Sequence, residues 1–378
     1  MRRIIYKILL LSAILSICFQ AFAQTTLWVA PKSSGVEFSE DTPGSLSGNS
    51  LKDRIIALRR SGERNIQVRL KSGVYSLDIP VVVDNEMAGS PKDTLSFVGL
   101  VTDSCAKDGK AILSGGRQVT GWKKAGKGIY KAQLPEGADF RQLYVNGQPA
   151  IRARHPNRDN DTDYGPYWRI QTLTNNDNDA MLKIKSSEYK HWSNLQEVEI
   201  VLNQHWYQCR LKINAVEEQG DQTLVTGSLR TSDWGEKEVP YYWENSLDFL
   251  DAEREWYFDK QTRWLYYKPQ SGEDIKQVEV IYPAMNRLFS IEGTVDMPVQ
   301  NVSVRNIELA YSNWTAPGIK GMVATQAVQP RYGVEVESMI QVNYADKVQI
   351  TNCNIFCVGG NGIAFLSEVN HSYNRMTK

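Results

Sequence analysis

The last third of the chain carries an alternating apolar and polar pattern that occurs twice. The apolar positions of residues 302–311 (VSVRNIELAY) return in residues 348–357 (VQITNCNIFC), at an offset of 46 residues, with Asn306 and Asn352 at equal positions. Alternation over a few residues is typical of a β-strand, and a fixed spacing between similar segments indicates a repeat architecture. The two segments therefore predict two copies of one unit, each with two short strands separated by an asparagine bend.

A third short strand precedes each copy, in residues 288–293 (LFSIEG) and 339–344 (MIQVNY), and residues 362–366 (GIAFL) open a further unit. Three short strands per unit, joined by bends, predict the coils of a right-handed parallel β-helix. Because stacked coils place equal positions above one another, Asn306 and Asn352 are expected to form a hydrogen-bonding ladder at one corner.

Similar short strands, broken by glycine, fill residues 66–116 and predict earlier coils. A capping-box-like start at Ser50 and Asp53 predicts an amphipathic helix over residues 51–60. We expect this helix to cover the open end of the coils, where strand edges would otherwise lie unpaired. The segment 312–337 is rich in glycine and proline and predicts a loop inserted into one coil.

The repeat is absent from the middle of the chain, where strands are longer and separated by turn signals. Asn146-Gly147 predicts one hairpin, and residues 259–262 (DKQT), between two aromatic strands, predict another. This pattern predicts an antiparallel, β-sandwich-like insertion. The sequence as a whole predicts an all-β protein: a right-handed parallel β-helix with that insertion and a short N-terminal capping helix. Its predicted parts are an export signal (1–23), the cap and first coils (24–116), the insertion (117–285) and further coils, incomplete at the C-terminus (286–378).

The first 23 residues have the pattern of a secretory signal. Arg2, Arg3 and Lys7 precede a short apolar run, and an Ala-x-Ala site ends at Ala23. The apolar run is shorter than the roughly 20 residues that a membrane-spanning helix needs. A lipid anchor at Cys18 is the alternative, and the large Ile before it argues against this. We therefore expect an exported protein without a membrane span, located in the periplasm, at the cell surface or outside the cell.

Charge and cysteine content narrow the class of protein. Lys and Arg total 43, as do Asp and Glu, so the basic excess that is typical of a nucleic-acid binder is missing. The cysteines that remain after signal removal are too few for a disulfide framework. Cys353 and Cys357 lack the second ligand pair that zinc requires, and small buried apolar side chains are the better interpretation of both.

Calcium is the one metal with a sequence pattern in its favour. Asp159, Asp161 and Asp163 alternate as in a calcium loop. The Gly at position six and the Glu at position twelve of an EF-hand loop are replaced by Tyr164 and Ile170. We therefore expect a polar loop and no cofactor, with calcium as the alternative.

Three segments resemble the secreted bacterial right-handed β-helix glycoside hydrolases, most closely those of glycoside hydrolase family 141. They are residues 141–157 (RQLYVNGQPAIRARHPN), 255–269 (EWYFDKQTRWLYYKP) and 359–365 (GGNGIAF). The resemblance extends over about Thr26 to Phe365. It implies an enzyme that degrades plant cell-wall polysaccharide, of the pectic or xylan type.

The chain departs from that family in one respect. Such proteins are usually longer, and their catalytic carboxylates lie on coils later than the last one here. The resemblance therefore implies a chain that is truncated before the later coils, and it assigns a catalytic role to none of its residues.

Five residues are candidates for contact with a polysaccharide or oligosaccharide. Glu335 and Glu337 alternate on a strand, about 7 Å apart by strand rise, a spacing that suits paired carboxyls in glycoside hydrolysis, although solvated surface glutamates show it too. His155 either anchors a turn or contacts a glycan. Trp206 and Trp314 either stack on sugar rings or pack in a core, and Trp314 opens the inserted loop, where β-helix clefts are built.

Two other functions remain open for this sequence. A polysaccharide lyase on the same fold usually needs calcium carboxylates on the coil strands, and no convincing cluster is found there. A non-catalytic carbohydrate-binding or adhesion protein is the second alternative. The oligomeric state has no signature in the sequence.

Overall fold

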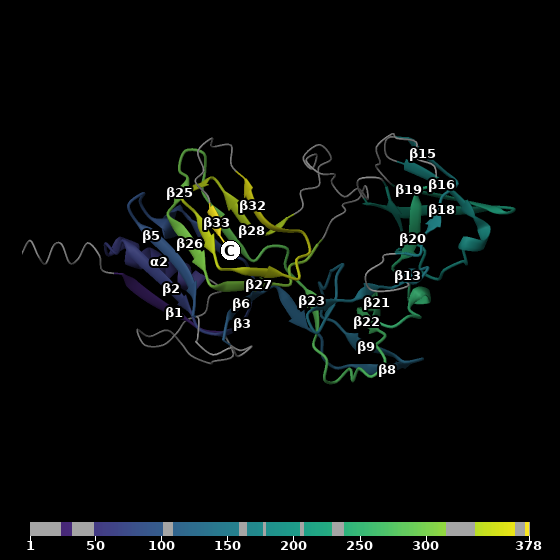
Figure 1. Ribbon diagram of the computed structural model, residues 1–378, viewed down its shortest axis with the longest axis horizontal. Helices are drawn as coiled ribbons and strands as arrows, with labels where there is room; N and C mark the ends of the chain where they lie inside the picture. The colour runs from purple at the N-terminus through teal and green to yellow at the C-terminus, as the bar shows by residue number, and fades with distance from the viewer. Residues whose placement is uncertain are drawn as a thin grey trace, which may run out of the picture. The chain divides into compact units, whose positions relative to one another are not determined.

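The fold is described from a computed structural model of the 378-residue chain (Figure 1). The structure describes residues 24–31, 49–100, 109–158, 165–176, 179–204, 208–228, 238–314, 337–366 and 375–377. The protein is all-β. It divides into a first unit (residues 1–115, 287–310 and 338–378) and a second unit (residues 116–286 and 311–337). Within the described ranges, no helix combines the length and the apolar character needed to cross a membrane.

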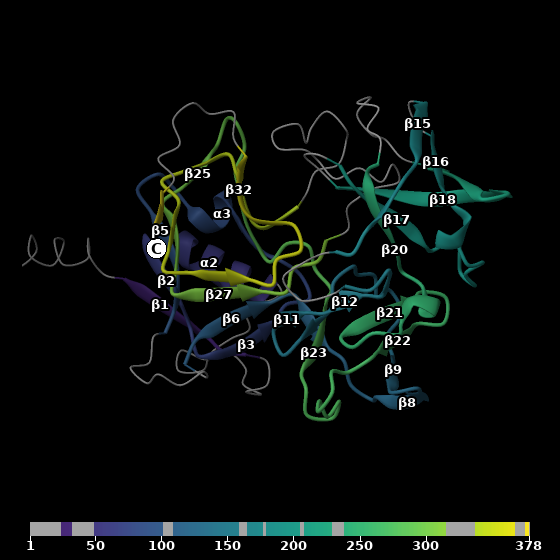
Figure 2. The same ribbon diagram turned by 45° about the vertical axis from the view of Figure 1, so that its right-hand side comes forward.

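The first unit contains three parallel sheets, which we call the strand stack. The chain passes from one sheet to the next and then returns to the first, as the colours of Figures 1 and 2 show. The first sheet is ordered β1 (Thr25–Val29), β2 (Asn65–Leu70), β5 (Thr94–Gly99), β26 (Val302–Arg305), β30 (Gln349–Thr351) and β33 (Arg375–Thr377). The second is β3 (Gly73–Ser76), β6 (Ala111–Ser114), β27 (Ile307–Ala310) and β31 (Asn354–Phe356). The third is β4 (Val81–Asp84), β24 (Phe289–Glu292), β28 (Ser338–Asn343) and β32 (Asn361–Leu366), and β25 (Val299–Gln300) pairs separately with β29 (Ala345–Asp346).

The pairing register confirms the internal repeat. Ser303 lies opposite Gln349 and Glu308 lies opposite Asn354, both at the predicted offset. The predicted third strands also pair with one another, β24 with β28 and β28 with β32. The two copies and the opening of a further unit are therefore successive layers of the strand stack.

The layers continue across a long interruption of the chain. Strand β4 pairs with β24, β5 with β26 and β6 with β27, all in parallel. Figure 2 shows β6 and β27 side by side, although the whole of residues 116–286 lies between them in sequence. Along the chain, the second unit thus lies between strands that pair as neighbouring layers of the first unit.

Alternating side chains of these strands fill the core of the first unit. Ile66, Val68 and Leu70 of β2 have no exposed surface, because every second side chain of a strand points to the same face. On neighbouring sheets, the ring of Phe97 meets the ring of Phe289 edge-on, with centroids 5.2 Å apart.

Helix α2 (Asn49–Arg60) belongs to the first unit and buries Leu51 and Ile55. It begins at Asn49, so Ser50 is a helical residue and the predicted capping position is wrong. The guanidinium group of Arg59 donates to the carbonyls of Met87 and Thr94. The first of these acceptors lies in the short helix α3 (Asn85–Ala88) and the second at the start of β5, so Arg59 ties α2 to the first layers.

The asparagine bends have a backbone reason and a side-chain reason. Asn306 and Asn352 have φ values of 57° and 52°, in the left-handed region that asparagine tolerates better than most residues. The Nδ2 of Asn352 donates to Oδ1 of Asn306 at 2.6 Å. Asparagine therefore both allows the bend and links one layer to the next.

The second unit is built from three sheets that are antiparallel apart from the pairing of β12 with β21. The largest contains β13 (Arg154–His155), β20 (Pro240–Glu244), β17 (Glu199–Asn203), β18 (Gln208–Gln219), β19 (Gln222–Ser228), β16 (Asp179–Lys185) and β15 (Thr172–Asn176), with β14 (Trp168–Arg169) on β20. The next contains β12 (Ile151–Arg152), β21 (Glu255–Asp259), β22 (Trp264–Tyr267), β9 (Ile129–Gln133) and β8 (Lys123–Gly126). The third contains β11 (Gln148–Pro149), β10 (Tyr144–Val145), β23 (Val280–Pro283) and β7 (Gly116–Gln118), and two 3-10 turns, η2 (Ser186–Glu188) and η3 (Leu247–Phe249), complete the unit.

Both predicted hairpins of this unit are confirmed. Strands β10 and β11 are joined by Asn146 and Gly147, which have φ values of 50° and 73°, as a two-residue hairpin turn requires. Strands β21 and β22 are antiparallel and flank the turn at residues 260–263.

Substitution at Asn352 separates the two roles of the bend. We expect Asn352→Gly to lower the free energy of unfolding by about 0.5–1 kcal/mol, because it keeps the backbone freedom and loses the hydrogen bond. Asn352→Ala should lower the free energy of unfolding by about 1–2 kcal/mol more than Asn352→Gly does, because alanine is strained at this positive φ. Urea unfolding followed by circular dichroism measures both. Asn354→Ala, on an extended strand, is the control, and equal stability of the Gly and Ala variants would contradict the backbone role.

Candidate functional site

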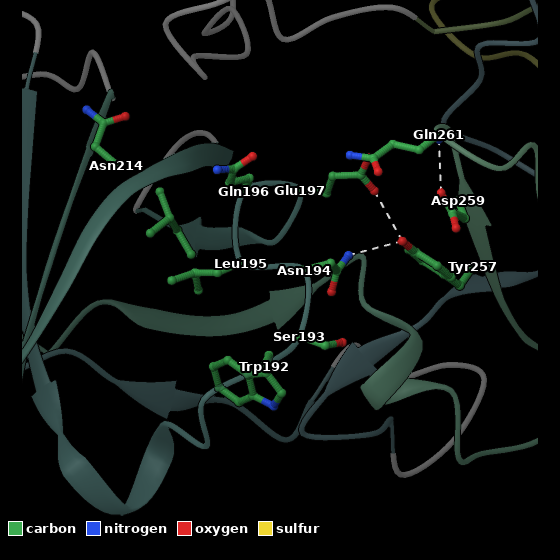
Figure 3. A pocket seen from close by; sticks show the side chains of 11 residues that line it. Trp192, Ser193, Asn194, Leu195, Gln196, Glu197, Asn214, Tyr257, Asp259 and Gln261 are labelled. Carbon is green, nitrogen blue, oxygen red and sulfur yellow. Dashed lines mark hydrogen bonds between the residues drawn. The ribbon is translucent and has the colours of Figure 1, made fainter.

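The second unit contains a pocket of about 530 Å³ (Figure 3). Three parts of the fold form it: the connection that precedes β17, the middle of β18, and the end of β21 with the turn that follows. Its lining is Trp192, Ser193, Asn194, Leu195, Gln196, Glu197, Ile213, Asn214, Tyr257, Asp259 and Gln261.

Strand geometry and turn chemistry position one wall of the pocket. Tyr257 and Asp259 are two residues apart on β21 and therefore share a face. The Oδ1 atom of Asp259 accepts from the backbone N–H groups of Gln261 (2.9 Å) and Thr262 (3.1 Å), and Oδ2 accepts from Oγ1 of Thr262 (2.6 Å). This is the pattern of an Asx turn, and it fixes Gln261 at the pocket.

A β-bulge positions Asn214 on a second wall. In the pairing of β18 with β19, Ile213 lies opposite Gly227 and Ala215 lies opposite Thr226, so Asn214 is the extra residue. A bulge bends the strand and redirects the side chain of the extra residue. Here the redirected amide lines the pocket (Figure 3).

A hydrogen-bond network positions three polar residues of the pocket lining, Tyr257, Glu197 and Asn194. The hydroxyl of Tyr257 donates to Oε2 of Glu197 and accepts from Nδ2 of Asn194, both at 3.1 Å. The Oδ1 atom of Asn194 accepts from Ser246 at 2.6 Å. Burial, followed by the nearby charges of Glu197 and Asp259, raises the pKa of Tyr257. Tyr257 therefore stays protonated and remains the donor to Glu197.

Trp192 supplies the apolar side of the pocket and is itself rigidly packed. Its ring centroid lies 4.5 Å from that of Trp243 and 5.0 Å from that of Phe249. Trp192, Leu195 and Ile213 are the apolar residues of the lining and form its apolar wall, and the other lining residues are polar.

His155 lies in the aromatic packing behind this wall. Its ring stacks on Phe249 and meets Trp168 edge-on, with centroid distances of 5.9 Å and 4.9 Å. Burial, followed by the charge of Lys190, lowers the pKa of His155. The structure therefore places His155 among aromatic rings, where it contributes packing, and outside the pocket lining.

Trp314 lies over a buried charge cluster, which consists of Arg141, Arg152, Glu199, Arg210 and Glu244. Its ring centroid is 5.4 Å from Cζ of Arg141 and 4.8 Å from Cζ of Arg210. Its backbone N–H donates to the side chain of Gln142 at 3.2 Å. The ring therefore interacts with guanidinium groups and covers the cluster.

Ion pairs connect the members of the charge cluster. The guanidinium group of Arg141 donates to both carboxylate oxygens of Glu199. The Nη1 atom of Arg152 reaches Glu199 at 3.3 Å and Glu244 at 3.0 Å, and Nε of Arg210 reaches Glu244 at 3.2 Å. Burial alone would raise the pKa of Glu199, but Arg152, Arg141 and Arg210 outweigh it and hold that pKa far below its usual range. Glu199 is therefore ionised in the folded protein.

The other predicted site residues are not brought to the pocket. Glu337 is exposed and directly precedes β28, so it does not lie on a strand as predicted. Glu335, Trp206 and the aspartates at 159, 161 and 163 lie outside the described residues. Among the residues that the structure does describe, no three His, Cys, Asp or Glu side chains are grouped as metal ligands.

The residues that form the pocket were not predicted as site residues. The turn at residues 259–262 was visible in the sequence, and its capping aspartate points to Gln261 as a fixed position. Glu197, Asn214 and Tyr257 have no local signal, because they lie on three different segments that only strand pairing brings together.

The protein is all-β, and its second unit contains a pocket whose lining is largely polar. Residues 129–270 match the family of the GH141 insertion domain, and this range contains the whole pocket lining. A solved structure titled "Glycoside hydrolase" matches with a TM-score of 0.74 and 24% sequence identity, over 90% of this chain and 63% of that chain. The present chain thus spans less than two thirds of that protein.

A second structure, titled "The complex structure of XylC with xylose", matches with a TM-score of 0.34 and 12% identity, over 89% of this chain and 43% of that chain. That score is too low to support an argument. No curated protein matches the chain. The insertion-domain match and the glycoside hydrolase neighbour support a carbohydrate-active protein.

Removal of one carboxylate tests the charge cluster. We expect Glu199→Gln to lower the free energy of unfolding at pH 7 by about 3–5 kcal/mol, because it leaves buried guanidinium groups without their partner. Since the folded pKa of Glu199 is depressed, its contribution is present above the unfolded pKa of about 4.3 and is lost as the pH falls towards the folded value. The difference between the two proteins should therefore shrink below about pH 4.

Denaturant unfolding at a series of pH values measures this difference. Glu136→Gln, at an exposed position of the same unit, is the control and should unfold like the unaltered protein. A pH-independent effect of Glu199→Gln would show that packing, and not ion pairing, accounts for the loss.

Proposed function

We propose that this protein is an exported glycoside hydrolase of the GH141 type that acts on plant cell-wall polysaccharide. The observation that carries the proposal is the match of residues 129–270 to the GH141 insertion domain. Residues 141–157 and 255–269, which resemble that family in the sequence, supply β10 to β13 and β21 to β22 of the second unit.

The scaffold of the proposed enzyme is a right-handed parallel β-helix. Three parallel sheets, a chain that visits them in turn, and a repeat whose copies pair in register support this architecture. The neighbour titled "Glycoside hydrolase" has a similar fold over 90% of this chain. Export is supported by the signal-like pattern of residues 1–23.

Hydrolysis of a glycosidic bond needs two carboxyl groups, about 5–5.5 Å apart for retention or about 6.5–9.5 Å apart for inversion. In the pocket, Asp259 is committed to its turn through three hydrogen bonds, and Glu197 is bound to the hydroxyl of Tyr257. We therefore propose that the pocket binds glycan and assign the chemical step to neither of these acids.

Product analysis tests the reaction class. Incubation of the whole protein, with any later coils on which the family resemblance places the catalytic carboxylates, with xylan and with pectic polysaccharides should release reducing sugar, because hydrolysis adds water across the glycosidic bond. The products should not absorb in the near ultraviolet, because no double bond forms. Polysaccharide incubated without the protein is the control.

Two outcomes would replace the proposal. An ultraviolet-absorbing product whose formation stops on addition of a chelator would indicate a polysaccharide lyase. Binding to polysaccharide without any product would indicate a non-catalytic carbohydrate-binding or adhesion protein.

A further inference from the structure

We propose that the pocket of the second unit is a binding subsite for the uncharged sugars of a neutral glycan, and that it disfavours uronic acids. The inference rests on the proposed function and narrows it, because plant cell-wall glycans include neutral chains of the xylan type and acidic chains of the pectic type. Size, hydrogen-bonding groups and charge each support it.

The size and the mixed character of the walls suit a sugar. A pocket of about 530 Å³ is within the range of about 300–1,000 Å³ for small-molecule sites. Leu195 presents apolar surface at the pocket, and the buried side chains of Trp192 and Ile213 lie beside it with their exposed edges. The C–H face of a sugar ring can pack against this wall. The remaining lining is polar, as the hydroxyl rim of a sugar requires.

Free hydrogen-bonding groups surround the pocket. The side-chain amides of Gln196, Asn214 and Gln261 make no hydrogen bond to any residue that the structure describes, and neither does Oε1 of Glu197. Each amide offers a donor and an acceptor, and a sugar hydroxyl needs both. Gln196, Asn214 and Gln261 are exposed. The bulge at Asn214 and the Asx turn before Gln261 fix the backbone from which two of these amides extend, so each amide can turn towards a ligand without a change in the backbone.

The charge of the lining selects against acidic sugars. Among the described residues of the lining, Glu197 and Asp259 are the carboxyl groups and none is Lys, Arg or His, while Tyr257 stays protonated. A uronate carboxylate bound here would face like charge without a cation to pair with, which strongly disfavours binding. The buried arginines of this unit do not change this, because Arg141, Arg152 and Arg210 are paired with Glu199 and Glu244.

Calorimetric titration of the full chain tests the inference. The probes are neutral xylo-, arabino- and galacto-oligosaccharides, and oligogalacturonides of equal length. We expect at least one neutral probe to bind at least about tenfold more tightly than its acidic counterpart. Asn214→Ala and Gln261→Ala should each weaken that binding roughly 2- to 10-fold, through the loss of one or two hydrogen bonds.

Two further variants sharpen the test. Glu197→Gln removes the charge of this side chain and keeps its shape. It should therefore reduce the ratio of the affinity for the neutral probe to the affinity for the acidic probe. Gln219→Ala is the matched control, because Gln219 is an exposed residue on the same strand as Asn214 and its side chain bonds only to Glu217. It should bind like the unaltered protein.

The outcomes separate this inference from the proposed function. Release of reducing sugar together with unaltered affinity in Asn214→Ala and Gln261→Ala would overturn the subsite and leave the hydrolase standing. Binding through the pocket without release of reducing sugar would support the subsite and overturn the proposed hydrolase. Equal or tighter binding of oligogalacturonide, or no binding of any probe, would also overturn the subsite.

Discussion

In-register pairing of strands across a long interruption of the chain is the constraint on which the structure depends. Strands β4, β5 and β6 pair with β24, β26 and β27, so the backbone groups of both sets are satisfied only if the chain returns to the correct position after residue 286. A shift of one residue would turn every buried side chain of a strand to the opposite face. The strands before and after the second unit in the chain therefore pair as neighbouring layers, although a separate unit is encoded between them.

The second unit uses charge in two contrasting ways. In the charge cluster, three arginines and two glutamates lie close together with little exposure, and each needs its partners because an unpaired buried charge is costly. In the pocket, two carboxyl groups are positioned by a tyrosine and by a turn, while neighbouring amides stay unsatisfied by the described residues. The first arrangement links distant segments of the unit through ion pairs, and the second, on our proposal, presents groups to a glycan. Trp314, for which the sequence left sugar stacking and packing open, lies against the arginines of the charge cluster.

Glycan binding by the inserted unit fits with the comparisons and with the chemistry of the pocket. The match to the GH141 insertion domain contains the whole pocket lining. The strand stack offers a rigid frame, since each of its layers is bonded to the layers on either side. On this proposal, the stack carries the fold of the enzyme, and the inserted unit contributes contacts to the chain of sugars.

Local chemistry was readable from the sequence by itself. The alternation of apolar residues, the spacing of the two repeats, the asparagine bends and the turn at Asn146-Gly147 each depend on a few neighbouring residues, and the structure contains all of them. Only the tertiary structure brought Glu197, Asn214 and Tyr257 to one pocket, and it alone gathered the buried charges beside Trp314. These groups come from distant segments, and the register of antiparallel pairing and one bulge decide which side chains meet. Neither the register nor the bulge has a local signature in the amino-acid sequence.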